Sequence, residues 1–415
     1  MSVPVATVTG MTTTLGVVYC EGWDPARRMI TGRLPVAVAR ERDRAGEQYA
    51  FCLVEQETGR VVRVGEIAWG ARFARVWTLD ELGRRARSAE YRVLGGRLFH
   101  LLTREWTYRG PESAEFAEDC DTVKISNEPD GQQRRQWQWE GGAGGGGSEW
   151  QHEGDPAEFF QDVPRFSDWA GLCAVDADLV EADSEQEFAE PPWHPSAPLR
   201  PEGLEAAFQP GRRWTVPHWN RTVVTELADG GTVRFPTGQV VVADPALLYD
   251  AKPFTATIAP GDHRLELSIL RFEDEPEHVR VAAAKLVVTP EPVVSWEHAV
   301  TAEQDTLLLG DGEYYGFGVD GGQGCFVDAV ACPALDELIA ESDEMIDQLC
   351  TTDGPRTAVL TEPESGGTLV AFSSGMGDGA YPVWVGRSAS GEVACFVADM
   401  LLLRYAEEVA EEVLT

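Results

Sequence analysis

The sequence has few lysines and no long apolar run. Lysine occurs only at positions 124, 252 and 285, so arginine supplies almost all the positive charge, a bias typical of a GC-rich genome rather than of a function. No apolar run approaches the roughly 20 residues that cross a bilayer, and the N-terminus lacks the basic start of a secretory signal. These absences predict a cytoplasmic protein without a membrane partner.

Cysteine patterns that bind zinc or carry redox chemistry are missing. The eight cysteines are scattered, and no pair has C-x-x-C spacing. In a chain of 415 residues, such cysteines are most simply small buried side chains in a reducing compartment.

Motifs that would identify a reaction are missing as well. The sequence has no G-x-x-x-x-G-K-[ST] phosphate loop, no calcium loop with alternating ligands and no G-x-S-x-G around Ser373 or Ser374. Gly316 and Gly318 lie in strand-like sequence without a following helix, which excludes a dinucleotide site. Whether the chain is an enzyme stays open at this level.

Positive charge is scarce overall and unevenly placed. The net charge of −35 argues against nucleic acid as a partner, because phosphates would be repelled. Residues 1–110 nevertheless contain 17 arginines and 12 acidic residues, whereas residues 111–415 contain 17 basic and 57 acidic residues. The imbalance indicates either a solvated acidic surface or docking of the basic N-terminal part, on the acidic remainder or on a protein partner.

Composition divides the chain into four parts. They are a basic α+β domain over residues 1–126, a flexible Trp/Gly-rich linker over 127–163, an acidic Pro-rich connector over 164–215 and a β-rich domain over 216–415. The linker contains three tryptophans, which are either incidental or form an adhesive surface.

Local patterns predict the elements of the first domain. Residues 34–40 are expected to form a strand, and residues 49–54 and 61–67 a hairpin around a glycine turn. Thr78 and Glu81 form a T-x-x-E capping box, which predicts a helix over residues 78–93.

The last domain is predicted to be a β-sandwich or barrel-like sheet with two helices. Short apolar strands alternate with glycine turns from residue 216 to residue 400. One helix is expected to begin at Pro333 and to present an apolar stripe as far as Leu349, and a second to begin near Leu401. The whole chain is therefore expected to be α+β and mostly β.

Two glycine-rich loops, residues 316–328 and 373–382, carry the candidate site residues. If the loops meet, Asp320, Asp328 and Asp378 converge, with Asp244 and Glu297 nearby. Three carboxylates together require a cation or raised pKa values, and oxygen-only ligands favour Ca²⁺ or Mg²⁺. Such an ion could activate water for hydrolysis, with these acids or Glu297 as catalytic groups. The alternative is that each aspartate accepts hydrogen bonds within its own turn.

A cysteine or serine nucleophile is a weaker possibility. His298, beside Glu297, is an available base, and Cys325 lies in the first glycine loop. Cys325 is flanked by Phe326 and Val327, which favours a buried structural role.

Residues about 235–400 resemble a bacterial family of unknown function, DUF4241. The resemblance lies in five pieces whose order and spacing are similar to those of the family: residues 242–245 (VADP), Pro260-Gly261, residues 295–299 (SWEHA), and the loops 316–328 and 374–386. It implies a bacterial source and one β-rich domain, and it implies no reaction.

These observations favour a binding or interaction module with a pocket at the Gly/Asp loops. The charge imbalance, the linker tryptophans and the missing catalytic motifs favour it. The alternative is a divalent-metal-dependent hydrolase that uses Asp320, Asp328 and Asp378.

Overall fold

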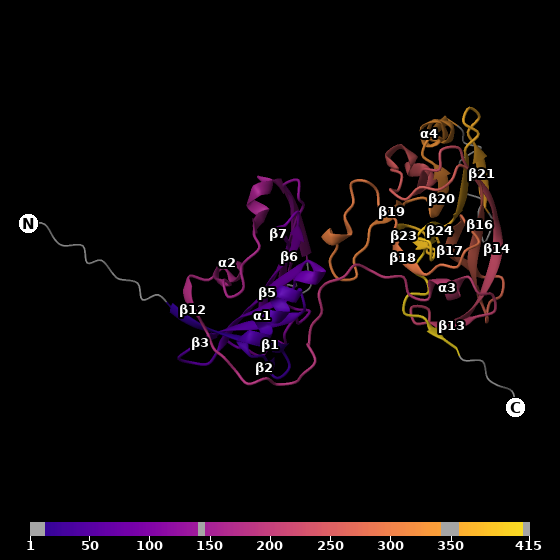
Figure 1. The fold of residues 1–415 in the computed structure, drawn as a ribbon. Helices are drawn as coiled ribbons and strands as arrows, with labels where there is room; N and C mark the ends of the chain where they lie inside the picture. Colours follow the sequence, from indigo (N-terminus) through magenta and orange to yellow (C-terminus); the bar gives the residue numbers. More distant parts are fainter. Residues whose placement is uncertain (1–12, 140–145, 342–356, 410–415) are drawn as a thin grey trace, which may run out of the picture. The chain divides into compact units, whose positions relative to one another are not determined.

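The computed structural model describes residues 13–139, 146–341 and 357–409 (Figure 1). The chain divides into two compact units, Met1–Ser196 and Ala197–Thr415. Both are built mainly from antiparallel strands, which confirms the prediction of an α+β protein that is mostly β. No helix in the described residues has the length and apolar character needed to cross a membrane.

The first unit contains one large sheet. Its main path runs β10-β9-β8-β7-β6-β5-β4-β3-β1-β12, antiparallel except for the parallel pair β1 and β12. Its strands are β1 (Thr13–Asp24), β2 (Met29–Arg33), β3 (Tyr49–Glu55), β4 (Val61–Ala68), β5 (Phe73–Leu79), β6 (Arg85–Leu94), β7 (Arg97–Thr107), β8 (Asp121–Asn127), β9 (Gln132–Trp139), β10 (Gly146–Glu153), β11 (Phe160–Asp162) and β12 (Ala177–Glu181). Its helical elements are α1 (Val36–Ala45), α2 (Ala170–Cys173) and the short 3₁₀ turns η1 (Trp69–Ala71) and η2 (Pro156–Phe159).

Two apolar clusters cover the two faces of this sheet. On one face Tyr19, Phe51 and their neighbours pack against Ala39 of α1 and Trp169 beside α2. On the other face Phe73 and Trp77 belong to a cluster with Trp193. The indole N–H of Trp193 donates to the Glu21 carbonyl at 2.8 Å, which fixes the chain after β12 on the sheet.

Two predictions for this unit are wrong. Residues 36–45 form α1 rather than a strand, because Pro35 stands at its N-cap and Gly46, at φ 73°, closes its end. Residues 78–93 form the end of β5 and most of β6 instead of a helix. Asp80 accepts the N–H groups of Leu82 and Arg84, at 2.9 Å each, and so closes a turn between the two strands.

The segment expected to be a flexible linker contains paired strands in its described residues. Strand β9 pairs with β8 on one side and with β10 on the other. Alternating glutamine, arginine and tryptophan side chains suit a strand whose two faces are both partly exposed. The boundary between the units falls at residue 196 rather than at the ends of the expected linker and connector.

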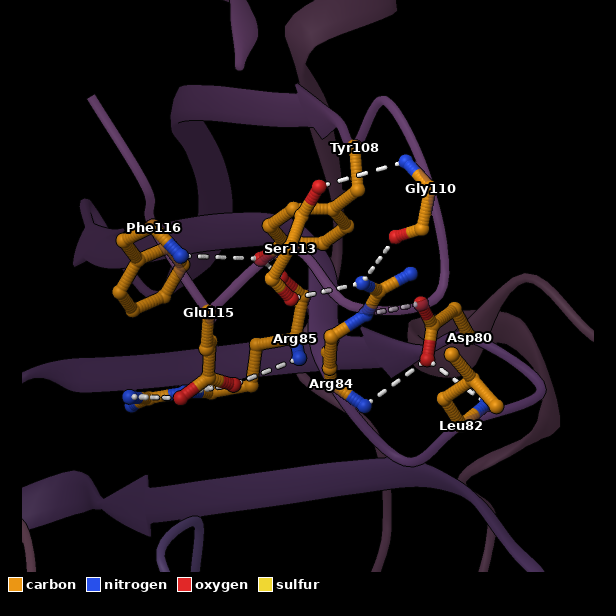
Figure 2. A network of polar contacts seen from close by, with 9 residues as sticks. All are labelled: Asp80, Leu82, Arg84, Arg85, Tyr108, Gly110, Ser113, Glu115 and Phe116. Atoms are coloured by element: carbon orange, nitrogen blue, oxygen red, sulfur yellow. Dashed lines mark hydrogen bonds and ion pairs between the residues drawn. The ribbon is translucent and has the colours of Figure 1, made fainter. Parts of the chain in front are cut away.

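Arg84 joins the β5–β6 turn to the segment after β7, as Figure 2 shows. Its guanidinium donates to the Asp80 carboxylate at 2.8 Å and to the carbonyls of Gly110 and Ser113, both at 2.9 Å. It also lies 4.2 Å from the centre of the Tyr108 ring. Because Arg84 is only 7 % exposed, these partners replace its solvent contacts.

Arg84→Ala is expected to destabilise the first unit by about 2–4 kcal/mol, because it leaves two carbonyls and a carboxylate without their buried donor. Hydrogen exchange of residues 108–116 should speed up, and the thermal transition should fall. Arg27, whose side chain is 77 % exposed, is the control, and Arg27→Ala should cost no more than about 0.5 kcal/mol. Equal effects of the two substitutions would contradict this role for Arg84.

The second unit contains two sheets. The larger runs β18-β23-β24-β17-β16-β14-β13-β25, with β19 paired to β23; the smaller runs β15-β20-β22-β21. The larger consists of β13 (Arg213–Val216), β14 (Arg221–Phe235), β16 (Gly261–Phe272), β17 (Val279–Val287), β18 (Ser295–His298), β19 (Gly316–Val319), β23 (Gly379–Arg387), β24 (Val393–Asp399) and β25 (Glu407–Glu408). The smaller consists of β15 (Val240–Ala243), β20 (Gln323–Asp328), β21 (Ala358–Thr361) and β22 (Thr368–Ser373). The helical elements are α3 (Leu204–Ala207), η3 (Pro245–Asp250), η4 (Thr306–Leu308) and α4 (Cys332–Glu341).

Strands β15, β20 and β22 of the smaller sheet are buried on both faces. Val242, Phe326 and Phe372 join the core of the larger sheet, whereas Cys325 and Ala371 pack on the other side against α4. Burial on two faces explains why these strands are continuous apolar runs rather than alternating ones.

The helix expected from Leu401 is wrong for residues 401–409, which form turns and β25. Leu401 and Tyr405 have φ values of 56° and 64°, which a right-handed helix does not contain. Asp399 accepts the N–H of Leu401 at 2.9 Å, and burial raises the pKa of this carboxyl. The helix expected from Pro333 is present as α4 up to Glu341; its expected continuation to Leu349 lies outside the described residues.

Candidate functional site

Asp244 holds the first glycine loop against the end of β15. Its side chain caps η3 by accepting the N–H of Ala246 at 2.9 Å. Its other oxygen accepts the N–H groups of Asp320 and Gly321, at 2.8 and 2.6 Å. The carboxylate is buried, so these three amides are its solvation. Asp244 therefore determines where β19 ends.

Asp328 is the second anchor and is fully buried at the end of β20. One carboxylate oxygen accepts the N–H groups of Thr237 and Gly238 at 2.7 and 3.0 Å. The other accepts the Thr237 hydroxyl at 2.6 Å and the N–H of Val330 at 3.0 Å. Only the Val330 amide belongs to the turn that follows Asp328, as in the alternative of hydrogen bonds within its own turn; the other three donors come from a turn about ninety positions earlier.

The two glycine loops touch through backbone. The N–H of Ser374 donates to the Gly322 carbonyl at 3.0 Å. The second loop also closes on itself, because the hydroxyls of Ser374 and Tyr381 both donate to the Gly377 carbonyl, at 2.8 and 2.9 Å.

The acids of these loops do not form one ligand set. Asp320 and Asp378 are exposed, whereas Asp328 is buried. Glu297 is exposed on β18 and accepts a hydrogen bond from Arg387 Nε at 2.8 Å. Within residues 13–139, 146–341 and 357–409, no group of three or more His, Cys, Asp or Glu side chains could hold a metal ion.

Cys325, the candidate nucleophile, and His298, the candidate base, also occupy structural positions. Cys325 is fully buried in β20, and burial raises the pKa of its thiol, which disfavours the reactive thiolate. The His298 ring packs at a tilt against Trp384, with 4.4 Å between ring centres, and its Nε2 lies 2.9 Å from the Leu199 carbonyl oxygen. Partial burial lowers the pKa of His298.

A cavity of about 370 Å³ lies beside the first glycine loop. Strands β15 and β19 line it with the segments after η3 and β18. Phe254 and Phe317 supply aromatic surface, and Lys252, Asp250 and Glu303 are exposed charged residues of the lining. The remaining lining residues are Val242, Ala243, Asp244, Leu247, Ala251, Ala299, Thr301, Gln304, Tyr315, Gly316, Gly318 and Val383.

Two polar side chains of this lining, Lys252 and Gln304, have groups that a ligand can contact. Lys252 has no ion-pair partner in the part of the chain that the structure describes. The side-chain oxygen of Gln304 accepts the N–H of Thr301 at 3.0 Å. The amide nitrogen of Gln304, with its two N–H donors, takes no part in that hydrogen bond. The cavity therefore combines aromatic surface with donors and charges of both signs.

Sequence reasoning identified only part of this cavity. It singled out the loop with Gly316 and Gly318 but missed residues 250–254 and 301–304. The available signal was the capped Asp-Pro turn at Asp244, which directs the following segment back across β15, where the Phe254 N–H donates to the Val240 carbonyl at 2.9 Å.

Residues 233–398 match the model of a family described as "Protein of unknown function (DUF4241)". The resemblance seen over residues about 235–400 is thereby confirmed, and both glycine loops and the whole cavity lining lie within the matched segment. No curated protein and no solved structure matches the chain.

Proposed function

We propose that this chain, which carries a DUF4241 domain over residues 233–398, is a binding module that receives an extended peptide segment of a protein partner. The cavity beside the first glycine loop is the binding site. The observation that carries the proposal is the position of this cavity at the edge of β19. In the described residues β19 pairs with β23 alone and lines the cavity, whereas β15 already accepts the Phe254 N–H at the Val240 carbonyl and contributes side chains to the lining.

Strand edges suit a peptide because their main-chain groups can pair with an added strand. Gly316 and Gly318 have no side chains that would hold the peptide backbone away from β19. Phe254 and Phe317 then offer a surface to an apolar side chain of the peptide. Lys252, Asp250 and Glu303 favour a peptide that carries charges of both signs next to that side chain.

The test is a substitution that fills the cavity without disturbing the fold. A Cβ added at Gly318 meets no atom within 4 Å, and its φ lies outside the left-handed range, so Gly318→Leu should fold. Peptides selected by the wild-type protein from a displayed random library should bind this variant at least tenfold more weakly, because leucine occupies the site. Binding is measured by fluorescence anisotropy or calorimetry.

Gly171→Leu is the matched control, because a Cβ there also meets no atom within 4 Å and the residue lies in the first unit. N-methylation of alternate peptide residues should abolish binding if the peptide adds as a strand. Equal binding by wild type and Gly318→Leu, or a library that yields no specific peptide, would refute the proposal.

Three further interpretations stay predictions. One is the divalent-metal-dependent hydrolase using Asp320, Asp328 and Asp378 with Ca²⁺ or Mg²⁺. Another is docking of the basic N-terminal part on acidic sequence, and the third is a cytoplasmic location. No contact in the described residues favours the hydrolase over the peptide-binding module.

A further inference from the structure

Strand β10 is an open edge with aromatic surface beside it. It stands at the end of the sheet of the first unit and pairs, in the described residues, with β9 alone. Trp150 lies opposite Arg135, and Ser148 lies opposite Trp137, so Trp137 and Trp150 share one face of the hairpin. These two side chains are 41 % and 50 % exposed. An exposed edge with aromatic side chains favours pairing with another strand.

We propose that β10 pairs antiparallel with β10 of a second copy of this chain, about a twofold axis at Trp150. The large sheet then continues from one copy into the other. The contact is isologous, so it closes at a dimer and leaves no β10 edge for further growth. Trp150 meets its own equivalent at the centre, and Trp137 of each copy lies diagonally next to this pair.

Charge selects this register over its neighbours. A twofold axis normal to the sheet must pass between one residue and the same residue of the second copy, which face each other. An axis at Glu149 places two glutamates directly opposite each other, and an axis at Gln151 places Glu149 opposite Glu153 of the second copy twice. An axis at Trp150 pairs Glu149 with Gln151 and Ser148 with His152, so no like charges face each other.

Substitutions of Gln151 test this register, because a charge at this position has opposite effects on the stability of one copy and on the pairing of two copies. Within one copy, residue 151 faces Arg134, so glutamate is favoured there and lysine is disfavoured. In the dimer it faces Glu149 of the second copy, so glutamate is repelled twice and lysine is attracted twice. Gln151→Glu should therefore weaken dimerisation about tenfold, and Gln151→Lys should strengthen it several-fold.

The measurement is sedimentation equilibrium of the full chain, from about 1 to about 300 µM, a range that brackets weak interfaces. Wild type should show a concentration-dependent dimer, and Trp150→Ser should shift it to monomer with an unchanged circular dichroism spectrum. A monomeric wild type would overturn the proposal. So would assembly beyond a dimer, or a dimer whose dissociation constant moves in the same direction for Gln151→Glu and Gln151→Lys.

Discussion

Asp328→Ala is expected to destabilise the second unit by about 3–5 kcal/mol, because it removes the buried carboxylate that accepts three N–H groups and a hydroxyl. Asp328→Asn should lower the free energy of unfolding by about 2–4 kcal/mol although the two side chains have the same shape. The amide nitrogen of asparagine is itself a donor, and it would replace a carboxylate oxygen that now accepts two hydrogen bonds. Both variants should lower the thermal transition and speed up hydrogen exchange in β15 and β20.

Asp320→Ala is the control from the same loop. Its side chain is exposed, so the substitution should change stability by no more than about 0.5 kcal/mol. The comparison also separates a structural role from the metal-ligand role. If Asp328 were a metal ligand, Asp328→Asn would leave the metal-free stability unchanged and abolish any rise of the transition with Ca²⁺ or Mg²⁺. That outcome would contradict the structural role of Asp328.

Strand content could be predicted wherever burial produces a clear pattern. The hairpin of β3 and β4 follows from its apolar runs and glycine turn, and the apolar runs of β20 and β22 mark strands. The sequence does not show which runs are buried on two faces, because that depends on α4 packing over the smaller sheet. Layer order is a property of the assembled unit and not of one window of sequence.

The errors arose where a local signal had two structural meanings. Thr78 and Glu81 match a capping box, but the same stretch holds Asp80, whose carboxylate closes a β turn. Long-range pairing of β5 with β4 and β6 then determines the conformation, and helix propensity is too weak to oppose it. The segment of β9 and β10 is polar and rich in glycine, and only its place beside β8 shows that it pairs.

The candidate site was predictable in its loops but not in its chemistry. The Ser374 N–H contacts the Gly322 carbonyl, an approach of backbone to backbone that glycine permits. The direction of each carboxylate depends on which amides lie within reach. Asp328 finds donors at Thr237 and Gly238, about ninety positions earlier in the chain, and no periodicity reports such a contact.

Gly238, which donates to Asp328, also allows two backbone segments to lie close together. Its N–H donates to Asp328, and its φ of 78° lies in the left-handed region. A Cβ added there would lie 2.0 Å from the Ile258 carbonyl oxygen. That oxygen cannot move easily, because the Ile258 N–H donates to the Gly238 carbonyl at 3.0 Å and a bridge joins Gln239 to Thr257. The clash involves backbone on both sides.

Gly238→Ala should therefore cost at least about 3 kcal/mol, part of it from left-handed strain and the larger part from the clash. Gly366→Ala separates strain from clash, since Gly366 has a similar φ of 72° but the nearest atom to an added Cβ is Nε of the exposed Arg234 side chain, at 3.7 Å. The control should lose only about 1 kcal/mol. Thermal scans of both variants measure the difference, and exchange of the Ile258 amide reports the strand contact directly. Equal losses would show that strain alone limits Gly238, and that the packing of this turn against Ile258 contributes nothing to the stability of the unit.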